Sequence, residues 1–450
     1  MRKGHTPEAK QVAAPPVPER ATQGADSHDL SRWWWVESGV WTERMLAALD
    51  NGVKGGKWFS LMDKVYAPRT LEQAWSRVHS KRGAGGIDGQ STARFAAQSS
   101  RYLEELHEAL KADGYQPQAV RRVEIPKAGG RTRALGIPTV KDRVVQGSLK
   151  LVLEPIFERE FVDTSYGFRP GRGCKDALRQ VQALLDEGYC WFVDADIESY
   201  FDSIAHERLM SRVEERVSDG RVLRLIEKYL KQDIVSQLTR WTPTGGTPQG
   251  AVLSPLLANI YLHPLDVELS KAGYQSVRYA DDLVIACRTR EEAEAALAQM
   301  QRWCQSQELR LHPDKTHVGD CRVQGQGFDF LGYRFEAGRR WVRKKSLKAF
   351  KARVKEKTRR TRGQSLRVII DDLNTSLKGW FAYFKHADRS TFRALDGFTR
   401  RRLRALLRKQ QHRPGMGMCA ADHHRWPNVF FARHGLFTLE TAHATASRSR

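Results

Sequence analysis

Three aspartates are the residues of this sequence best suited to carry out chemistry. Asp281 and Asp282 stand side by side inside a short apolar segment, and Asp196 ends another apolar run. Adjacent carboxylates are costly to bury unless a cation balances them, and hard divalent cations take carboxylate oxygens as ligands. A pair of such cations can activate a hydroxyl nucleophile and stabilise a leaving pyrophosphate in phosphoryl transfer. The sequence therefore predicts that Asp196, Asp281 and Asp282 are catalytic and bind two Mg²⁺ ions.

The elements that must position these aspartates are predicted from the hydrophobic pattern. Residues 189–196 predict a buried strand that ends at Asp196, and residues 277–287 predict a hairpin with Asp281 and Asp282 at its turn. If these strands pair side by side, the three carboxylates meet. The motif Tyr-Ala-Asp-Asp at 279–282 is short enough to occur by chance, and acids in a turn usually lie in polar surroundings. The apolar residues on both sides favour the metal site.

The remaining elements are predicted from the same periodicities. Residues 1 to about 30 are polar and rich in Pro, Ala and Gln, so we expect disorder there. Trp33, Trp34 and Trp35 could form a docking surface, but packing against the next helix is favoured. An extended segment is expected at 120–125, before a turn at Gly129-Gly130. Helices are expected at about 42–50, 70–78, 102–112, 141–160, 173–187, 207–217, 221–231, 254–269 and 289–308.

Length, charge and cysteine content limit the class of protein. A chain of 450 residues exceeds the usual size of a single core, and no apolar run is long enough to span a membrane. The net charge of +23 favours a polyanionic partner such as nucleic acid. The 6 cysteines are scattered without a C-x-x-C pair, which indicates reduced thiols and neither a disulfide scaffold nor a zinc site. No apolar signal segment follows Met1, so we expect a soluble, cytoplasmic protein.

Most of the excess positive charge lies in one segment. Residues 341–413 hold 23 Lys or Arg and 5 Asp or Glu, a net charge of +18. Leu347, Phe350 and Val354 alternate with basic residues at a spacing that predicts a helix with one buried and one cationic face. The cationic face would contact phosphates, although a solvated helix surface is the usual alternative. Four aromatic residues could stack on bases or pack in a core, namely Trp380, Phe381, Tyr383 and Phe384.

Eight sequence blocks follow one another in a fixed order. They include Gly-Gly-Ile-Asp-Gly at 85–89, the segments within 125–143, Tyr-Gly-Phe-Arg-Pro at 166–170, 194–202, Gly-Thr-Pro-Gln-Gly and Leu-Ser-Pro within 246–255, Tyr-Ala-Asp-Asp at 279–282, Leu-His-Pro-Asp-Lys-Thr at 311–316, and Phe-Leu-Gly-Tyr at 330–333. In this order they resemble the reverse transcriptase and maturase proteins encoded by bacterial group II introns. The resemblance runs from about Leu61 to the C-terminal tail.

The resemblance implies a fold class and a domain organisation. We expect an α+β right-hand polymerase, with fingers and a palm built on an antiparallel sheet at 61–340, after a partly disordered N-terminal extension at 1–60. A basic helical thumb, the maturase domain, is expected at 341–413, and a C-terminal tail at 414–450. Many relatives carry a cysteine-paired nuclease after this point. Cys419, His423 and His424 are too sparse to form one, so we expect no HNH endonuclease domain.

The resemblance also implies roles for single residues near a bound nucleotide. Lys127 and Arg133 match residues that contact the triphosphate, and Phe201 matches a side chain that excludes a ribose 2′ hydroxyl. Gln249 lies in a loop that approaches the nascent base pair, and Lys315 matches a lysine near the leaving pyrophosphate. From the residues alone, a solvated turn, a core phenylalanine, a plain loop and a surface cation remain alternatives.

Two further aspartates and a set of basic residues complete the predicted site. Asp194 and Asp202 match acids of the family that are not ligands, so both are excluded from the metal set. Seven basic residues are predicted to contact nucleic acid: Arg169, Lys348, Lys351, Arg353, Lys355, Arg359 and Arg360.

The function implied by the resemblance is RNA-directed DNA synthesis from a primer, together with binding of the intron RNA to assist splicing and mobility. The implied partners are the intron RNA and an RNA template, a DNA target and primer, and dNTPs, without a membrane; no oligomeric state follows. The alternatives are a host-adopted reverse transcriptase in repair or defence and an RNA-binding splicing factor whose polymerase site has lapsed. Intact Asp196, Asp281 and Asp282 count against the second. The implied location is the bacterial cytoplasm, with association with the nucleoid left open.

Overall fold

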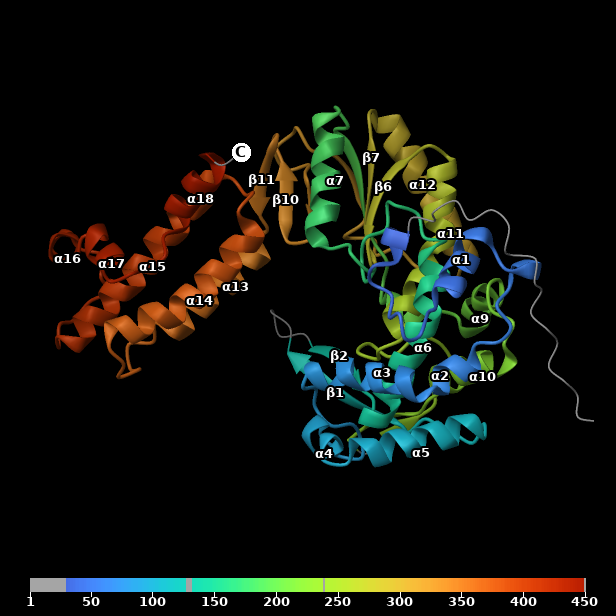
Figure 1. Ribbon diagram of the computed structural model, residues 1–450. Helices are drawn as coiled ribbons and strands as arrows, with labels where there is room; N and C mark the ends of the chain where they lie inside the picture. The colour runs from blue at the N-terminus through green and yellow to red at the C-terminus, as the bar shows by residue number, and fades with distance from the viewer. Residues whose placement is uncertain (1–29, 127–131, 238, 449–450) are drawn as a thin grey trace, which may run out of the picture.

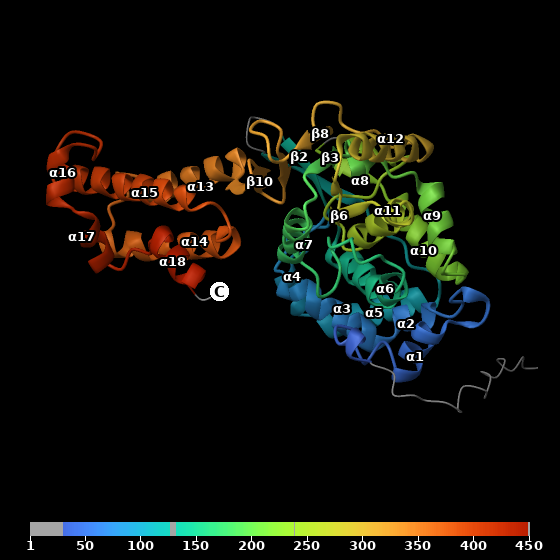
Figure 2. The same ribbon diagram turned by 90° about the horizontal axis from the view of Figure 1, so that it is seen from above.

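The computed structural model describes residues 30–126, 132–237 and 239–448. The disorder expected at 1–30 falls almost entirely outside these residues, as do Lys127 and the turn at Gly129-Gly130. Figures 1 and 2 show two parts, which we call the body and the arm. The body contains residues 30–342, and the arm is the elongated group of helices at 344–448 that projects from it.

The central sheet of the body, the palm sheet, has the antiparallel strand order β6-β7-β3-β8. Its strands are β3 (Trp191–Asp196), β6 (Gln275–Tyr279), β7 (Asp282–Cys287) and β8 (His317–Asp320). The predicted strand and the predicted hairpin are therefore confirmed, but the hairpin turn lies one residue earlier than predicted, at Ala280 and Asp281, and Asp282 begins β7. Val193 and Ile285 join one hydrophobic core and Phe192 and Val284 join a second, because successive side chains of a strand point to opposite faces.

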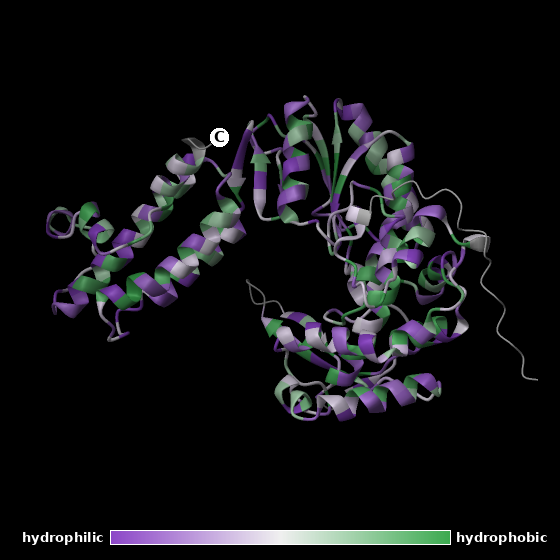
Figure 3. Cartoon of the chain, in the orientation of Figure 1, coloured by the Kyte–Doolittle hydropathy of each residue, from purple (hydrophilic) through white to green (hydrophobic). Residues whose placement is uncertain are grey.

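Helices cover both faces of the palm sheet (Figure 1). On one face lie α11 (Ser254–Lys271) and α12 (Arg290–Ser306), and on the other lies α7 (Cys174–Asp186). The hydroxyl of Thr289 accepts a backbone N–H in the first turn of α12, which caps this helix, and Ala293, Ala296 and Met300 are buried at helical spacing. Figure 3 shows the palm strands largely in the green of hydrophobic residues, as expected of a sheet covered on both faces.

The other half of the body is built around a second sheet with the order β2-β1-β4-β5. Its strands are β1 (Val120–Pro126), β2 (Thr132–Ile137), β4 (Ile234–Ser236) and β5 (Thr239–Trp241). Around the two sheets lie α2 (Met62–Tyr66), α3 (Pro68–Ser80), α4 (Thr92–Ala96), α5 (Ser99–Lys111), α6 (Val140–Glu158), α8 (Tyr200–Ser203), α9 (His206–Glu214) and α10 (Gly220–Leu230). Helix α6 is buried on nearly all sides, so one core runs from these helices to the palm sheet.

The N-terminal part of the described chain packs on this core. It consists of η1 (Leu30–Trp33), α1 (Glu43–Asn51) and η2 (Lys54–Gly56). Trp33 is only 3% exposed and Trp35 packs against the core, whereas Trp34 is 74% exposed. Packing is thus confirmed for the first and third tryptophans. Every helix predicted between residues 42 and 308 is also confirmed, and its ends differ from the prediction by three residues at most.

A third sheet connects the body to the arm. Its strands, in the order β11-β10-β9, are β9 (Phe328–Phe330), β10 (Tyr333–Glu336) and β11 (Arg339–Val342). The arm consists of α13 (Lys344–Lys357), α14 (Leu366–Phe384), α15 (Arg389–Gln410), α16 (Ala420–Arg425), α17 (Asn428–Arg433) and α18 (Leu439–Arg448). Phe192 of the palm sheet stacks on Phe328 with ring centroids 4.2 Å apart, and Phe328 stacks on Phe335 at 4.9 Å. The second hydrophobic core is therefore continuous from the palm sheet into the arm.

The four aromatic residues of α14 belong to this core. Phe381 and Phe384 are buried, Trp380 and Tyr383 pack against the same cluster, and the rings of Trp380 and Phe384 lie 4.7 Å apart. Core packing, and not base stacking, is their role in this structure. None of the helices in the described ranges is long and apolar enough to cross a membrane.

Candidate active site and basic surface

The palm sheet brings the three predicted aspartates together at one edge. Asp196 is the last residue of β3 and lies directly opposite Asp282, the first residue of β7, in the strand register. Asp281 lies in the two-residue turn that joins β6 to β7. Residues that face each other in an antiparallel pair have Cβ atoms about 5 Å apart, which is within reach of a shared cation. The juxtaposition that the sequence predicted is therefore present.

The electrostatics of this edge favour a bound cation. Burial raises the pKa of Asp282 to about 6; the charges of Asp281 and Asp196 add to this rise, and those of Arg343 and Lys315 oppose it. Burial also raises the pKa of Asp281, and the charge of Asp196 adds to it. The Lys315 ammonium lies 2.6 Å from a carboxylate oxygen of Asp196. The clustered carboxylates repel one another, and one of them already pairs with an ammonium group. A divalent ion would relieve this repulsion and stabilise the ionised carboxylates.

The donor set suits Mg²⁺ as an ion shared with a substrate. Across 30–126, 132–237 and 239–448, no group of three or more His, Cys, Asp or Glu side chains is arranged to hold a metal ion by itself. Mg²⁺ is commonly bound by one or two carboxylates, with water and substrate phosphates completing its octahedral shell. The hard oxygen donors of Asp196, Asp281 and Asp282 fit this mode.

Two of the predicted nucleotide residues, Arg133 and Gln249, lie on elements that contact each other. Arg133 is on β2, and its Nε donates to the Gln249 side-chain oxygen at 2.8 Å. This contact links the second sheet to the loop at 246–250. Lys127 lies outside the described residues, so its predicted contact with a triphosphate stays a prediction.

Phe201 is half-buried and is held by its backbone against the same loop. The Thr247 N–H donates to the Phe201 carbonyl at 2.7 Å, and the Gly246 N–H donates to the Ile204 carbonyl at 2.7 Å. Gly246 has a φ of 84°, and a Cβ there would lie 2.9 Å from Asp202 Cα. Only glycine allows this approach. Phe201 and the loop of Gln249 are thus fixed to each other.

The two excluded aspartates have different surroundings. The half-buried Asp194 accepts the backbone N–H of Asp329 at 3.3 Å and thereby joins β3 to β9. Burial raises the pKa of Asp194 to about 6. Asp202 is exposed in α8.

Arg343, which sequence reasoning missed, lies 3.5 Å from Asp329 at the junction of body and arm.

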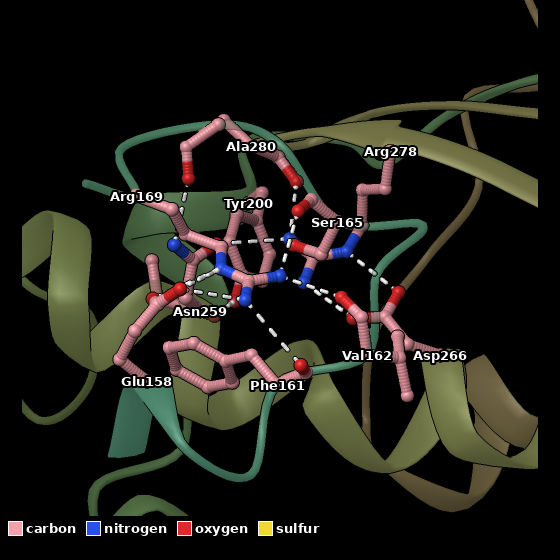
Figure 4. Close-up of polar contacts among 12 residues, drawn as sticks. Glu158, Phe161, Val162, Ser165, Arg169, Tyr200, Asn259, Asp266, Arg278 and Ala280 are labelled. Atoms are coloured by element: carbon pink, nitrogen blue, oxygen red, sulfur yellow. Dashed lines mark hydrogen bonds and ion pairs between the residues drawn. The ribbon is translucent and has the colours of Figure 1, made fainter. Parts of the chain in front are cut away.

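The prediction that Arg169 contacts nucleic acid is wrong. Its side chain is only 2% exposed and forms a two-nitrogen ion pair with Glu158 at 2.7 to 3.0 Å (Figure 4). Arg169 also donates to the carbonyls of Val162 and Ser165 at 2.5 and 2.7 Å. Every nitrogen of the guanidinium is used within the protein, so none is left for a phosphate. The sequence block at 166–170 does not reveal this, because Glu158 belongs to the preceding helix.

The basic residues predicted in the arm are all on its surface. Phe350 and Val354 are buried in the arm core and Leu347 packs against it, which confirms the predicted apolar face of α13. Four basic residues of α13 and two that follow its end are exposed. We call this set the α13 surface: Lys348, Lys351, Arg353, Lys355, Arg359 and Arg360.

Other basic residues of the arm are structural. Arg404 is 2% exposed and donates to the Trp426 carbonyl at 2.9 Å and to the Asn428 side chain at 2.9 Å. Arg408 pairs with Asp422 at 2.7 Å. These contacts attach α16 and α17 to α15. The net charge of 341–413 therefore overstates the surface that can contact phosphates.

Two family models match the chain. The model described as "Reverse transcriptase (RNA-dependent DNA polymerase)" matches residues 125–335, and "Group II intron, maturase-specific domain" matches residues 347–425. The first contains all three aspartates of the site, and the second contains the α13 surface.

Among curated proteins, YkfC of Escherichia coli is 34% identical over 318 residues, which cover 61% of this chain and 82% of YkfC. The group II intron-encoded protein LtrA of Lactococcus lactis subsp. cremoris is 39% identical over 196 residues, which cover 43% of this chain and 32% of LtrA. This chain thus aligns with most of YkfC and with about a third of LtrA.

Among solved structures, a telomerase from Candida albicans with a telomeric RNA fragment superimposes on 72% of this chain and 65% of its own, with a TM-score of 0.41 and 12% identity. A chain of a partial Cas6-RT-Cas1–Cas2 complex superimposes on 55% of this chain and 43% of its own, with a TM-score of 0.35 and 24% identity.

Proposed function

Since the chain belongs to the reverse transcriptases that carry a group II intron maturase-specific domain, we propose that it copies RNA into DNA from a primer and binds intron RNA to assist splicing and mobility. The observation that carries this proposal is the strand register that sets Asp196 opposite Asp282, with Asp281 in the adjoining turn. The implied substrates are dNTPs and a DNA primer or target.

In this proposal, Asp196, Asp281 and Asp282 hold two Mg²⁺ ions. When bound, these ions supply activation of the primer 3′ hydroxyl and stabilisation of the leaving pyrophosphate. Lys315 supplies a further positive charge beside Asp196, where negative charge develops on the leaving group. Burial raises the pKa of Asp281 and of Asp282, and a bound cation would stabilise the ionised form of both carboxylates.

Arg133, Gln249 and Phe201 bind and select the nucleotide. A triphosphate competes with Gln249 for the Arg133 guanidinium, because charged phosphate oxygens accept stronger hydrogen bonds than an amide does. Phe201 occupies the space of a ribose 2′ hydroxyl and so favours deoxynucleotides. Its backbone bond to the loop of Gln249 supports this role, since it fixes the ring relative to the base-pair loop.

RNA binding is assigned to the α13 surface. Exposed cations on one helical face contact successive phosphates, and affinity increases with the number of charges engaged. We place fingers and palm at 61–340, thumb and maturase domain at 341–413, and the tail at 414–450. The proposed boundary between 340 and 341 falls within β11, two residues before this strand ends at Val342, and α13 begins at Lys344.

The test is extension of a DNA primer on an RNA template by the purified protein with Mg²⁺. Asp281→Ala should abolish extension, because it removes a carboxylate ligand, and should leave RNA affinity within about threefold. Glu198→Ala is the matched control, since this exposed acid lies two residues beyond Asp196, and it should extend normally. Normal extension by Asp281→Ala contradicts the proposal. Tight RNA binding without extension by the wild type would instead indicate a splicing factor.

A further inference from the structure

Arg278 lies in β6, three residues before Asp281, and its side chain is buried (Figure 4). Its Nε and Nη2 donate to the two carboxylate oxygens of Asp266 at 2.7 and 2.5 Å. Its Nη1 donates to the Asn259 side-chain oxygen at 3.0 Å and to the Ala280 carbonyl at 2.9 Å. All three nitrogens therefore have partners, and one of these partners belongs to the catalytic turn.

The turn needs support from outside the sheet. Ala280 has a φ of 60°, in the left-handed region that residues with a Cβ rarely adopt. The strand ladder does not include Ala280, because β6 ends at Tyr279 and β7 begins at Asp282. Such conformations persist where the surroundings hold them in place. The hydrogen bond from Arg278 holds the Ala280 carbonyl, and this carbonyl belongs to the peptide plane that leads into Asp281.

The loop at 164–168 packs against the same turn. The Arg278 N–H donates to the Thr164 carbonyl at 2.9 Å, and the Tyr166 N–H donates back to the Arg278 carbonyl at 2.8 Å. At Gly167 a Cβ would lie 2.2 Å from the Ala280 nitrogen, so the loop backbone directly contacts the turn. The Asn259 amide donates to the Gly167 carbonyl at 2.8 Å. The turn is thus enclosed between this loop and the Arg278 side chain.

Helix α11 provides the support for both sides. Asn259 and Asp266 are seven residues apart, which is about two helical turns, so both project from one face of the helix. Both are buried, with Asn259 2% exposed and Asp266 fully buried. Asn259 contacts the loop and Arg278 at once. One buried helix therefore supports the catalytic turn from two sides, through the Arg278 side chain and through the loop at 164–168.

We propose that Arg278 is a positioning residue for catalysis, which holds the Ala280 carbonyl so that Asp281 is presented to the reacting groups in a single orientation. The inference rests on the proposed polymerase function. The competing explanation is that Arg278 only neutralises Asp266 and stabilises the fold.

Replacing the whole ion pair separates the two roles. Removing one partner leaves a buried charge unpaired, whereas replacing both with apolar side chains of similar volume is often neutral for stability. Arg278→Met/Asp266→Leu therefore removes the donor to Ala280 without leaving a lone charge. We expect the melting temperature of the metal-free protein to stay within about 5 °C of the wild type. We expect kcat for primer extension to fall about 100-fold, with KM for dNTP within about threefold.

A second variant and a matched control keep the test decisive. Arg278→Lys keeps a charge beside Asp266 but cannot reach Asp266, Asn259 and Ala280 at once, so kcat should fall while the fold persists. Lys150→Met/Glu154→Leu replaces an ion pair of α6, 3.2 Å apart, whose two members lie outside both the turn and the loop at 164–168. Its kcat should stay within about fivefold of the wild type.

A folded pair variant with wild-type kcat overturns the inference. An equal loss of kcat in the Lys150 control, which would indicate general loosening of the fold, also overturns it. Unfolding of both Arg278 variants overturns it as well. If Asp281→Ala is inactive while the Arg278 pair variant is fully active, the proposed function stands and this inference falls. If Asp281→Ala extends primers normally, the proposed function itself fails.

Discussion

Basic residues have different roles in the body and in the arm. In the body, Arg169 and Arg278 are buried, and each faces a carboxylate with two nitrogens. On the α13 surface, basic side chains are exposed to solvent. A buried guanidinium cannot exchange its carboxylate for a phosphate without leaving an unpaired charge behind, whereas an exposed cation can. The partner of a basic residue, and not its charge, therefore identifies the surface that is available to nucleic acid.

Removing Arg169 should have the largest effect on stability and would sharpen this comparison. Arg169→Met leaves Glu158 buried without a partner, so we expect the free energy of unfolding to fall by about 3–5 kcal/mol. The measurement is urea denaturation. Arg169→Met/Glu158→Leu should recover most of the loss, because neither charge remains. RNA affinity of the folded fraction should not change. A specific loss of RNA affinity, with stability intact, would restore Arg169 as a nucleic-acid contact.

Neutralising the α13 surface should have an intermediate effect, on binding and not on stability. Lys348→Gln/Lys351→Gln/Lys355→Gln should weaken RNA binding about 10- to 100-fold at low salt and lower the slope of log affinity against log salt by about 2–3. The matched control replaces three exposed cations of the body, Lys271, Arg290 and Arg302, with Gln. An unchanged slope in the arm variant, or an equal change in the control, would break the distinction between body and arm.

Neutralising Asp282 should have the smallest effect. It should raise the stability of the protein, whereas removing Arg169 lowers it. The folded-state pKa of Asp282 lies near 6, above its ordinary value of 3.8, so ionisation opposes folding once the pH rises through this window. Asp282→Asn should raise the melting temperature without metal by about 2–4 °C at about pH 8, and by nothing at about pH 3. The effect is modest because Asp282 is exposed at the sheet edge, where solvent screens its charge. A stabilisation independent of pH would show that the carboxylate charge is not its cause.

The sequence predicted the features that are local in the chain. The strand ending at Asp196 and the hairpin at Asp281 and Asp282 follow from apolar runs with acids at their ends, and both are present. The buried face of α13 follows from helical spacing in the same way. The site roles of Arg133, Phe201, Gln249 and Lys315 stay predictions, as do the domain boundaries.

Features that depend on distant partners were missed. The role of Arg169 is set by Glu158, and that of Arg278 by Asp266 and Asn259 on another element. An arginine before an acidic turn has the same sequence signature whether it binds phosphate or supports the backbone. The strands β4, β5 and β9 have only three residues each, which is too short for a periodicity to be recognised.

The position of β3 in the palm sheet has a consequence for the order in which the chain is made. Within the described part of the chain, this strand, at 191–196, pairs with β7 at 282–287 on one edge and with β8 at 317–320 on the other. Both partner strands are synthesised after it. At the usual rate of translation the nascent chain carries the unpaired strand for roughly 5–25 s. The helices α13 and α14, by contrast, are neighbours along the chain and can pair as they emerge. The carboxylates of the catalytic edge lie at the end of β3 and at the start of β7, so they cannot meet before residues 282–287 have been synthesised.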